Sequence, residues 1–185
     1  MPRRGNRRNV RTKATRDQPS RELLRGFVTA TKTLAVPITW TTEGRNFRFQ
    51  VPLDIDGITE PGLTLIGRAS TAVPYRHVSL NLAYRTPEGA GGTFERLDWR
   101  PIDAHDNKGN ARADLAWMQI SGTHHHAWAL NEHLKMEETL DDLPVAEPVQ
   151  PEPATWAELL RVAARVWKID GLQDLPLPPW EPSLL

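Results

Sequence analysis

Cysteine is absent from this chain of 185 residues. Its absence excludes disulfides, thiolate nucleophiles and zinc sites built on cysteine, so any metal would be held by nitrogen and oxygen ligands. The chain also lacks an apolar run long enough to cross a bilayer, and it does not open on a charged-then-apolar leader of the secretory type. We therefore expect a soluble, cytoplasmic protein with no membrane partner.

An excess of charge of either sign is missing as well, because Lys and Arg together number 23 and so do Asp and Glu. The distribution is uneven, however, since residues 1–18 are basic, polar and aperiodic, which predicts a disordered arm. Such an arm binds nucleic acid phosphates by counterion release, so RNA is one expected partner. A solvated tail that only maintains solubility is the alternative, because the arm has no aromatic residue for base stacking.

Secondary structure is indicated by hydrophobic periodicity and turn residues. A helix begins after Ser20, which fits an N-cap, and runs to about Lys32. The next segments read as strands joined by Gly and Pro turns, the clearest being Phe47–Leu53, where apolar and polar residues alternate. The expected strands are Val36–Thr42, Phe47–Leu53, Leu63–Ile66 after a Pro61-Gly62 turn, Val78–Tyr84, Thr93–Trp99 and Trp117–His126. The pattern predicts an α+β fold, a curved antiparallel sheet with an N-terminal and a C-terminal helix packed against it.

The expected organisation has five parts. After the arm, residues 19–143 form the α+β core domain and 144–153 a linker of proline and acidic residues. Residues 154–171 form a C-terminal helix that packs on the core, with Gly171 at its C-cap, and 172–185 a proline-rich tail. Among the tryptophans we expect Trp40, Trp99, Trp117 and Trp156 in the core, whereas Trp128 and Trp180 could be exposed.

Histidines are concentrated in one stretch. Four of the six lie between Thr123 and His133, and His105 is in the preceding loop. If Thr123–Ala127 is extended, His124 and His126 face one side, with Cα atoms roughly 7 Å apart, and His125 faces the other. If the two strands adjoin, His105 approaches the same pocket.

Two chemistries fit this cluster. In a metal-free nuclease, one imidazole takes a proton from a ribose 2′-hydroxyl and another protonates the leaving oxygen, while Arg100 or Arg96 neutralises the phosphate. In a metal site, His105, His124 and His126 are ligands and Asp103, Asp106 or Glu132 completes the shell. Arg96 and Asn107 are further candidates for substrate binding. So is Trp128, through base stacking, although core packing is the preferred role for that residue. A third interpretation is that the histidines are surface and supporting groups on a polar strand.

The order Arg96-Leu97-Asp98, His105, Asn107 and then Thr123-His124-x-His126 resembles a family of small uncharacterised proteins of phages and mobile elements. More distantly, it is similar to TumE-type toxins of toxin–antitoxin modules. The resemblance implies that His105, His124 and His126 are site residues, supported by Arg100 and by Asp98 as a further candidate ligand.

We therefore expect a small protein that acts on RNA through a histidine-centred site, a possible endoribonuclease with a divalent metal or with no cofactor. A cognate antitoxin or a host protein would be its protein partner. The alternative is a non-enzymatic phage or mobile-element protein that binds and blocks a host complex.

Overall fold

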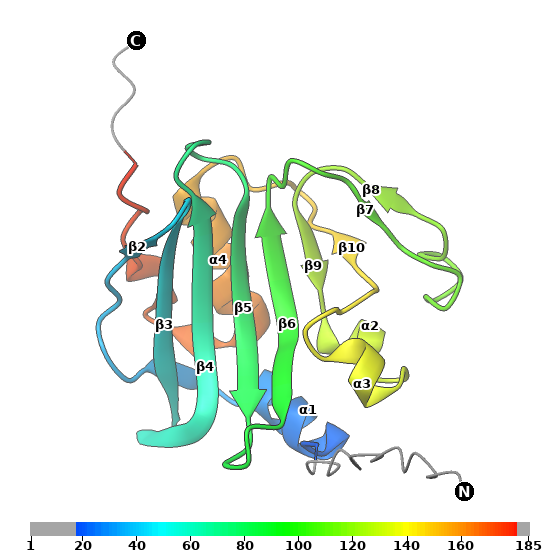
Figure 1. Cartoon of the computed structure of the whole chain (residues 1–185), viewed down its shortest axis with the longest axis horizontal. Coiled ribbons are helices and arrows are strands. Elements are labelled where there is room, and N and C mark those ends of the chain that lie inside the picture. The colour runs from blue at the N-terminus through cyan, green and yellow to red at the C-terminus, as the bar shows by residue number, and fades with distance from the viewer. Residues whose placement is uncertain (1–17, 181–185) are drawn as a thin grey trace, which may run out of the picture.

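The computed structural model describes residues 18–180, in which nine strands form one sheet and two further strands form a hairpin beside it (Figure 1). Across the sheet the order is β10 (Glu147–Pro148), β9 (His124–His126), β6 (Gly91–Trp99), β5 (Val78–Arg85), β4 (Ile58–Ser70), β3 (Asn46–Ile55), β1 (Lys32–Leu34) and β11 (Ile169–Asp170), with β2 (Thr41–Glu43) paired to β3. All neighbours are antiparallel except β1 and β11. The hairpin joins β7 (His105–Asp106) to β8 (Gln119–Ile120).

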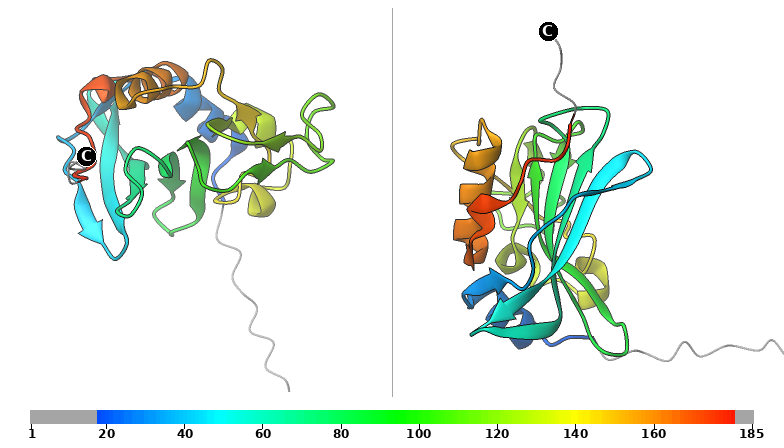
Figure 2. Two further views of the ribbon diagram at one scale, coloured as in Figure 1. Left: turned by 90° about the horizontal axis from the view of Figure 1, so that it is seen from above. Right: turned by 90° about the vertical axis from the view of Figure 1, so that its left-hand side faces the viewer.

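Helices α1 (Arg21–Thr29) and α4 (Trp156–Trp167) lie on the same face of the sheet (Figure 2). Helix α1 begins at its predicted cap, where the Ser20 hydroxyl accepts the Leu23 N–H, and at the start of α4 the Thr155 hydroxyl accepts the Glu158 N–H. Their apolar faces join the inward side chains of the sheet in one core. The predicted α+β class, with both helices packed on the sheet, is confirmed. The shorter helices are α2 (Trp128–Asn131), α3 (Met136–Thr139) and the 3₁₀ turn η1 (Leu172–Asp174).

The predicted first helix ends three residues early, at Thr29, because the chain there turns into β1. Lys32 is fully buried, and its ammonium group donates to the carbonyls of Phe27 and Ala30, each at 2.6 Å. It therefore satisfies carbonyl groups at the end of α1 that the helix itself leaves unpaired.

The central strands alternate as period two requires. Phe49, Val51 and Leu53 of β3 point toward the helices, while Arg48 and Gln50 point to the other side. On that second side no helix within residues 18–180 covers β3, β4 or β5 (Figure 2). The sheet therefore has one apolar face and one polar face, and the polar face is open.

Several predicted boundaries are wrong. The predicted strand Val36–Thr42 is irregular except at its end, because β1 stops before it at Leu34 and β2 begins only at Thr41. Pro61-Gly62 lies inside β4, because the hairpin turn is made by Asp56-Gly57, both with positive φ. Trp117–His126 divides into β8 and β9 at Gly122, whose φ is +90°.

The C-terminal third also differs from expectation. Residues 144–153 contain β10, which pairs with the histidine strand β9 instead of serving as a linker. Lys168, in the left-handed region, is the C-cap of α4, and Gly171 precedes η1. Residues 1–17 of the predicted basic arm and 181–185 of the tail lie outside the described residues. Among the described helices, none combines the length and apolar character that crossing a bilayer would require.

Candidate functional site

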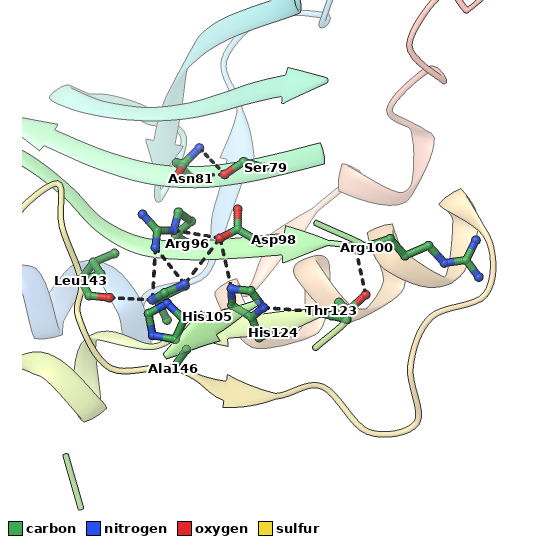
Figure 3. A network of polar contacts seen from close by, with 12 residues as sticks. Ser79, Asn81, Arg96, Asp98, Arg100, His105, Thr123, His124, Leu143 and Ala146 are labelled. Carbon is green, nitrogen blue, oxygen red and sulfur yellow. Dashed lines mark hydrogen bonds and ion pairs between the residues drawn. The ribbon is translucent and has the colours of Figure 1, made fainter. Parts of the chain in front are cut away.

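Three histidines converge on the open face at the edge of the sheet. His124 and His126 come from β9 and His105 from β7, and one ring nitrogen of each lies within 4.8 Å of the others (Figure 3). His125, between the first two, points to the helix-covered side. The geometric prediction from the spacing is confirmed, since the two β9 histidines share a face and His105 meets them there.

Each of these three histidines donates a ring N–H to a main-chain carbonyl. Nδ1 of His124 lies 2.9 Å from the Gly122 oxygen, and Nδ1 of His126 lies 2.6 Å from the Leu143 oxygen. Nε2 of His105 lies 3.2 Å from the Pro144 oxygen and 3.1 Å from Oδ1 of Asn107. A carbonyl oxygen only accepts, so each of these nitrogens carries the proton and the other ring nitrogen holds a lone pair in the neutral imidazole. Metal-binding histidines have this arrangement.

Asp98, on β6, brings a carboxylate to the same place. Its Oδ2 atom lies 3.4 Å from Nε2 of both His124 and His126. Burial alone would raise the pKa of Asp98, but its polar contacts with His124 and His126 and the charge of Arg96 hold this pKa well below its usual value. The carboxylate is therefore ionised at neutral pH and gives the cluster an oxygen donor.

Arg96 contacts both Asp98 and His126. Its Nε lies 3.0 Å from Oδ2 of Asp98, close enough for an ion pair although the N–H is misaligned for a hydrogen bond. One of its terminal nitrogens, Nη2, lies 2.8 Å from Nε2 of His126. Because a guanidinium only donates, this contact needs Nε2 of His126 to be unprotonated. The side chain thus covers the lone pair that a cation would use.

Burial keeps two of the imidazoles neutral. His126 is fully buried, and burial lowers its pKa to about 4, against the opposing effect of the Asp98 carboxylate. Burial also lowers the pKa of His105, as does the nearby charge of His124. Both residues are therefore poor proton donors at neutral pH and good lone-pair donors.

Two side chains behind the cluster fix the loops that carry it. The buried Asn107 amide donates to the carbonyls of Leu115 and Ala146, and its Oδ1 accepts the Ala146 N–H and the His105 ring. Oε1 of Glu152 accepts both the backbone N–H and the hydroxyl of Thr123, at 2.9 Å each. These two hydrogen bonds from Thr123 to Glu152 anchor the turn whose Gly122 carbonyl orients His124.

The opposite face of β9 is held by a buried carboxylate. Oε2 of Glu95 accepts a hydrogen bond from Nε2 of His125 at 2.6 Å and another from the Trp167 indole at 2.9 Å. Its Oε1 accepts the backbone N–H of Trp128 at 2.6 Å. Sequence reasoning missed Glu95, although a charged residue at an inward position of Thr93–Trp99 was a usable signal.

Other predicted site residues lie elsewhere. Arg100 points away from the histidines, with its guanidinium carbon 5.3 Å from the Trp99 ring centroid (Figure 3). Trp128 is 2% exposed and belongs to the core, so it has no surface on which a base could stack. Asn107 is also unavailable to substrate, because all its polar atoms are bonded within the protein.

The carboxylates first considered as a fourth ligand are not in the cluster. Asp106 accepts from Gln119, Glu132 pairs with Arg25, and Asp103 is an exposed residue that borders a hollow beside Arg100. Within the described residues the histidine cluster therefore has Asp98 as the carboxylate in contact with it.

Comparison of the chain with protein-family models, with curated proteins and with solved structures gave no match. The candidate site consequently stands on its own geometry: three imidazoles, one ionised carboxylate and one arginine at the edge of an open polar sheet face.

Proposed function

We propose that His105, His124 and His126 bind a divalent cation of the zinc type, with Asp98 as a fourth donor, and that the protein uses this centre to cleave phosphodiester bonds in RNA. The observation that carries the proposal is the common orientation of the three imidazoles. Each is fixed by a carbonyl at one nitrogen, which leaves a lone pair on its other nitrogen, and one ring nitrogen of each lies within 4.8 Å of the others. Three nitrogen donors and a carboxylate suit Zn²⁺ and neighbouring first-row cations.

The same geometry disfavours the metal-free mechanism. A general acid must hold a proton at the working pH and deliver it to substrate. His126 has a pKa of about 4, is fully buried and is bonded at both nitrogens. The pKa of His105 is lowered in the same direction. Neither residue is suited to protonate a leaving oxygen.

In the proposed reaction one water molecule is added across a phosphodiester. The water oxygen bonds to phosphorus, the bond from phosphorus to the departing ribose oxygen breaks, and that oxygen takes up a proton. A cation held by His105, His124, His126 and Asp98 would lower the pKa of water to near neutrality and so supply the nucleophile. No oxidant, reductant or further co-reactant is consumed.

Arg96 has a distinct role in this scheme. Its Nη2 donates to the lone pair on Nε2 of His126, so a cation held at that nitrogen would displace this guanidinium. The freed group remains beside Asp98, where it can neutralise the phosphate as negative charge develops. RNA is favoured as the substrate by the resemblance of the histidine stretch to mobile-element proteins and TumE-type toxins.

The experiment has two readouts, metal content and cleavage. Purified protein is analysed for bound metal by mass spectrometry and then tested on a labelled single-stranded RNA, with and without chelator. We expect about one cation per chain, chelator-sensitive cleavage, and loss of both in the His124→Ala/His126→Ala variant. The matched control His133→Ala removes an exposed histidine outside the cluster and should retain both.

The outcomes separate the alternatives. Cleavage that survives chelator, with no bound metal, would restore the metal-free mechanism. A bound cation without cleavage would support the metal centre and overturn the proposed nuclease activity. If the folded protein at matched concentration shows no bound metal and no cleavage, the proposal as a whole is overturned.

One observation favours the second candidate, a protein that binds and blocks a partner. Trp117, near the β7–β8 hairpin, is 79% exposed, and tryptophan is enriched among residues that dominate protein interfaces. In that case Trp117→Ser would abolish partner capture, whereas the histidine variants would leave it intact.

A further inference from the structure

The open face of the sheet carries mostly polar side chains in two rows that end at the histidine cluster. Paired positions across β3, β4, β5, β6 and β9 place Arg48, Arg68, Ser79, Asp98 and His124 in one row. The next row contains Gln50, Ile66, Asn81, Arg96 and His126. Directly paired residues of antiparallel strands share a face, so both rows lie on the side that the helices leave uncovered.

This face is hollowed next to the site. A hollow of about 270 Å³ is lined in part by Arg96, Asp98 and Arg68. A second, of about 460 Å³, is lined in part by Arg68, Arg48 and Arg85. The two hollows share Asn46 and Arg68, so they adjoin and together make up a depression over β3–β6. At one end of it Arg96 and Asp98 also contact the histidine cluster.

The charges in this depression point to an anionic ligand. Arg48 and Arg68 lie directly opposite each other on neighbouring strands, which is unfavourable for like charges. Within residues 18–180 no ion pair joins Arg68 to a carboxylate. The acids nearby are engaged, Asp98 by Arg96 and Asp141 by the Thr93 N–H. Glu43 pairs with Arg48, but this pair is exposed and so contributes little.

The rows also indicate how the ligand is recognised. They contain arginine, amide and hydroxyl groups and no Phe, Tyr or Trp. Arginines with small polar groups contact phosphate and sugar, which carry no sequence information. With strands about 4.8 Å apart, Arg68 lies two strands, or roughly 10 Å, from Asp98. One phosphate at the histidine cluster does not reach that far.

We propose that the depression over β3–β6 binds the sugar–phosphate backbone of a single-stranded RNA, with Arg68 and Arg48 holding a phosphate away from the one at the histidine cluster. This inference rests on the proposed function for its choice of RNA. It adds the path that the RNA follows across the sheet, a requirement for more than one phosphate, and recognition that is independent of the RNA sequence.

The test compares Arg68→Gln with Arg165→Gln, which removes an exposed arginine from α4 on the opposite side of the sheet. Binding of a labelled 2′-O-methyl RNA of about a dozen nucleotides is followed by fluorescence anisotropy over a range of salt. We expect Arg68→Gln to weaken binding roughly tenfold and Arg165→Gln to leave it unchanged. The slope of log K against log salt should fall by about 0.7 for each arginine removed from the depression, as in Arg48→Gln/Arg68→Gln.

Cleavage of two substrates separates this inference from the proposed function. A dinucleotide has one phosphate, so Arg68→Gln should cleave it like the wild type while showing a raised KM on the longer RNA. Equal binding and equal KM for Arg68→Gln and wild type would overturn the depression as the RNA path and leave the nuclease intact. Wild-type protein that binds RNA through Arg68 without cleaving it would support the path and overturn the nuclease. Duplex RNA bound as tightly as the single strand would overturn the single-strand assignment.

Discussion

Glu95 and His125 form a buried hydrogen bond of 2.6 Å on the face of the sheet opposite the candidate site. His125 lies between the two histidines that face the cluster, so this bond fixes which of the three consecutive imidazoles points away from it. A shift of β9 by one residue would still place an imidazole on the open face, but the bond to Glu95 and the paired geometry of His124 and His126 would be lost.

Replacement of this carboxylate should destabilise the fold. In Glu95→Gln, one of the three buried N–H donors from His125, Trp128 and Trp167 would meet the new amide N–H instead of an oxygen. We expect the free energy of unfolding to fall by about 1–3 kcal/mol in urea denaturation. Glu88→Gln, an exposed loop variant, is the control and should not change it. An unchanged midpoint for Glu95→Gln would show that Glu95 does not hold the strand.

The contact with Glu95 also shows where sequence reasoning succeeds and where it stops. Alternation within Phe47–Leu53 predicted a strand with the correct buried side, because a half-buried strand needs period two. The spacing of His124 and His126 predicted their common face for the same reason. These inferences are local, and the local signal was strong.

The supporting contacts came from distant parts of the chain. Leu143 and Pro144 supply carbonyls to His126 and His105, yet their surroundings read as a polar, proline-containing connection. β10 pairs with β9 although Pro148 and the acidic residues around it weaken any strand signal. Arg100 looked equivalent to Arg96, but its positive φ takes its side chain off the alternating pattern of β6. Each of these features depends on contacts between distant parts of the chain, which no local sequence pattern indicates.

Asn107 should prove important for metal affinity without contacting metal. Asn107→Ala removes an acceptor from the His105 ring and leaves buried main-chain groups of Ala146 and Leu115 without partners. We expect zinc affinity to fall about tenfold and stability by about 2 kcal/mol. Competition titration with a chromophoric chelator measures the first and urea denaturation the second. Asn110→Ala, in the exposed part of the same loop, should change neither.

Acid should destabilise the metal-free protein before carboxylates titrate. The pKa of His126 is about 4 in the folded chain and 6.5 as its ordinary value, so the unfolded chain binds an extra proton between these limits. Stability therefore rises with pH across this window and is lost as pH falls from about 6.5 to 4, by about 3 kcal/mol from this group. The lowered pKa of His105 acts in the same direction.

Urea denaturation of chelator-treated protein at several pH values measures this dependence. His126→Asn should flatten the curve between pH 4 and 6.5, while His133→Asn, in an exposed position, should keep the wild-type slope. An identical slope in His126→Asn and wild type would mean that His126 is not the group responsible.

Trp117 contradicts the expectation that it anchors the core. It is 79% exposed with a φ of +62°, and its ring lies over Gly109, where an added Cβ would come within 2.5 Å of the ring. We expect Trp117→Ser to change the free energy of unfolding by less than about 0.5 kcal/mol, whereas Trp128→Ala should cost about 3–5 kcal/mol. Acrylamide quenching gives an independent check, because loss of Trp117 should remove the most accessible fraction of the tryptophan emission. A quenching curve unchanged by Trp117→Ser would place this indole in the interior after all.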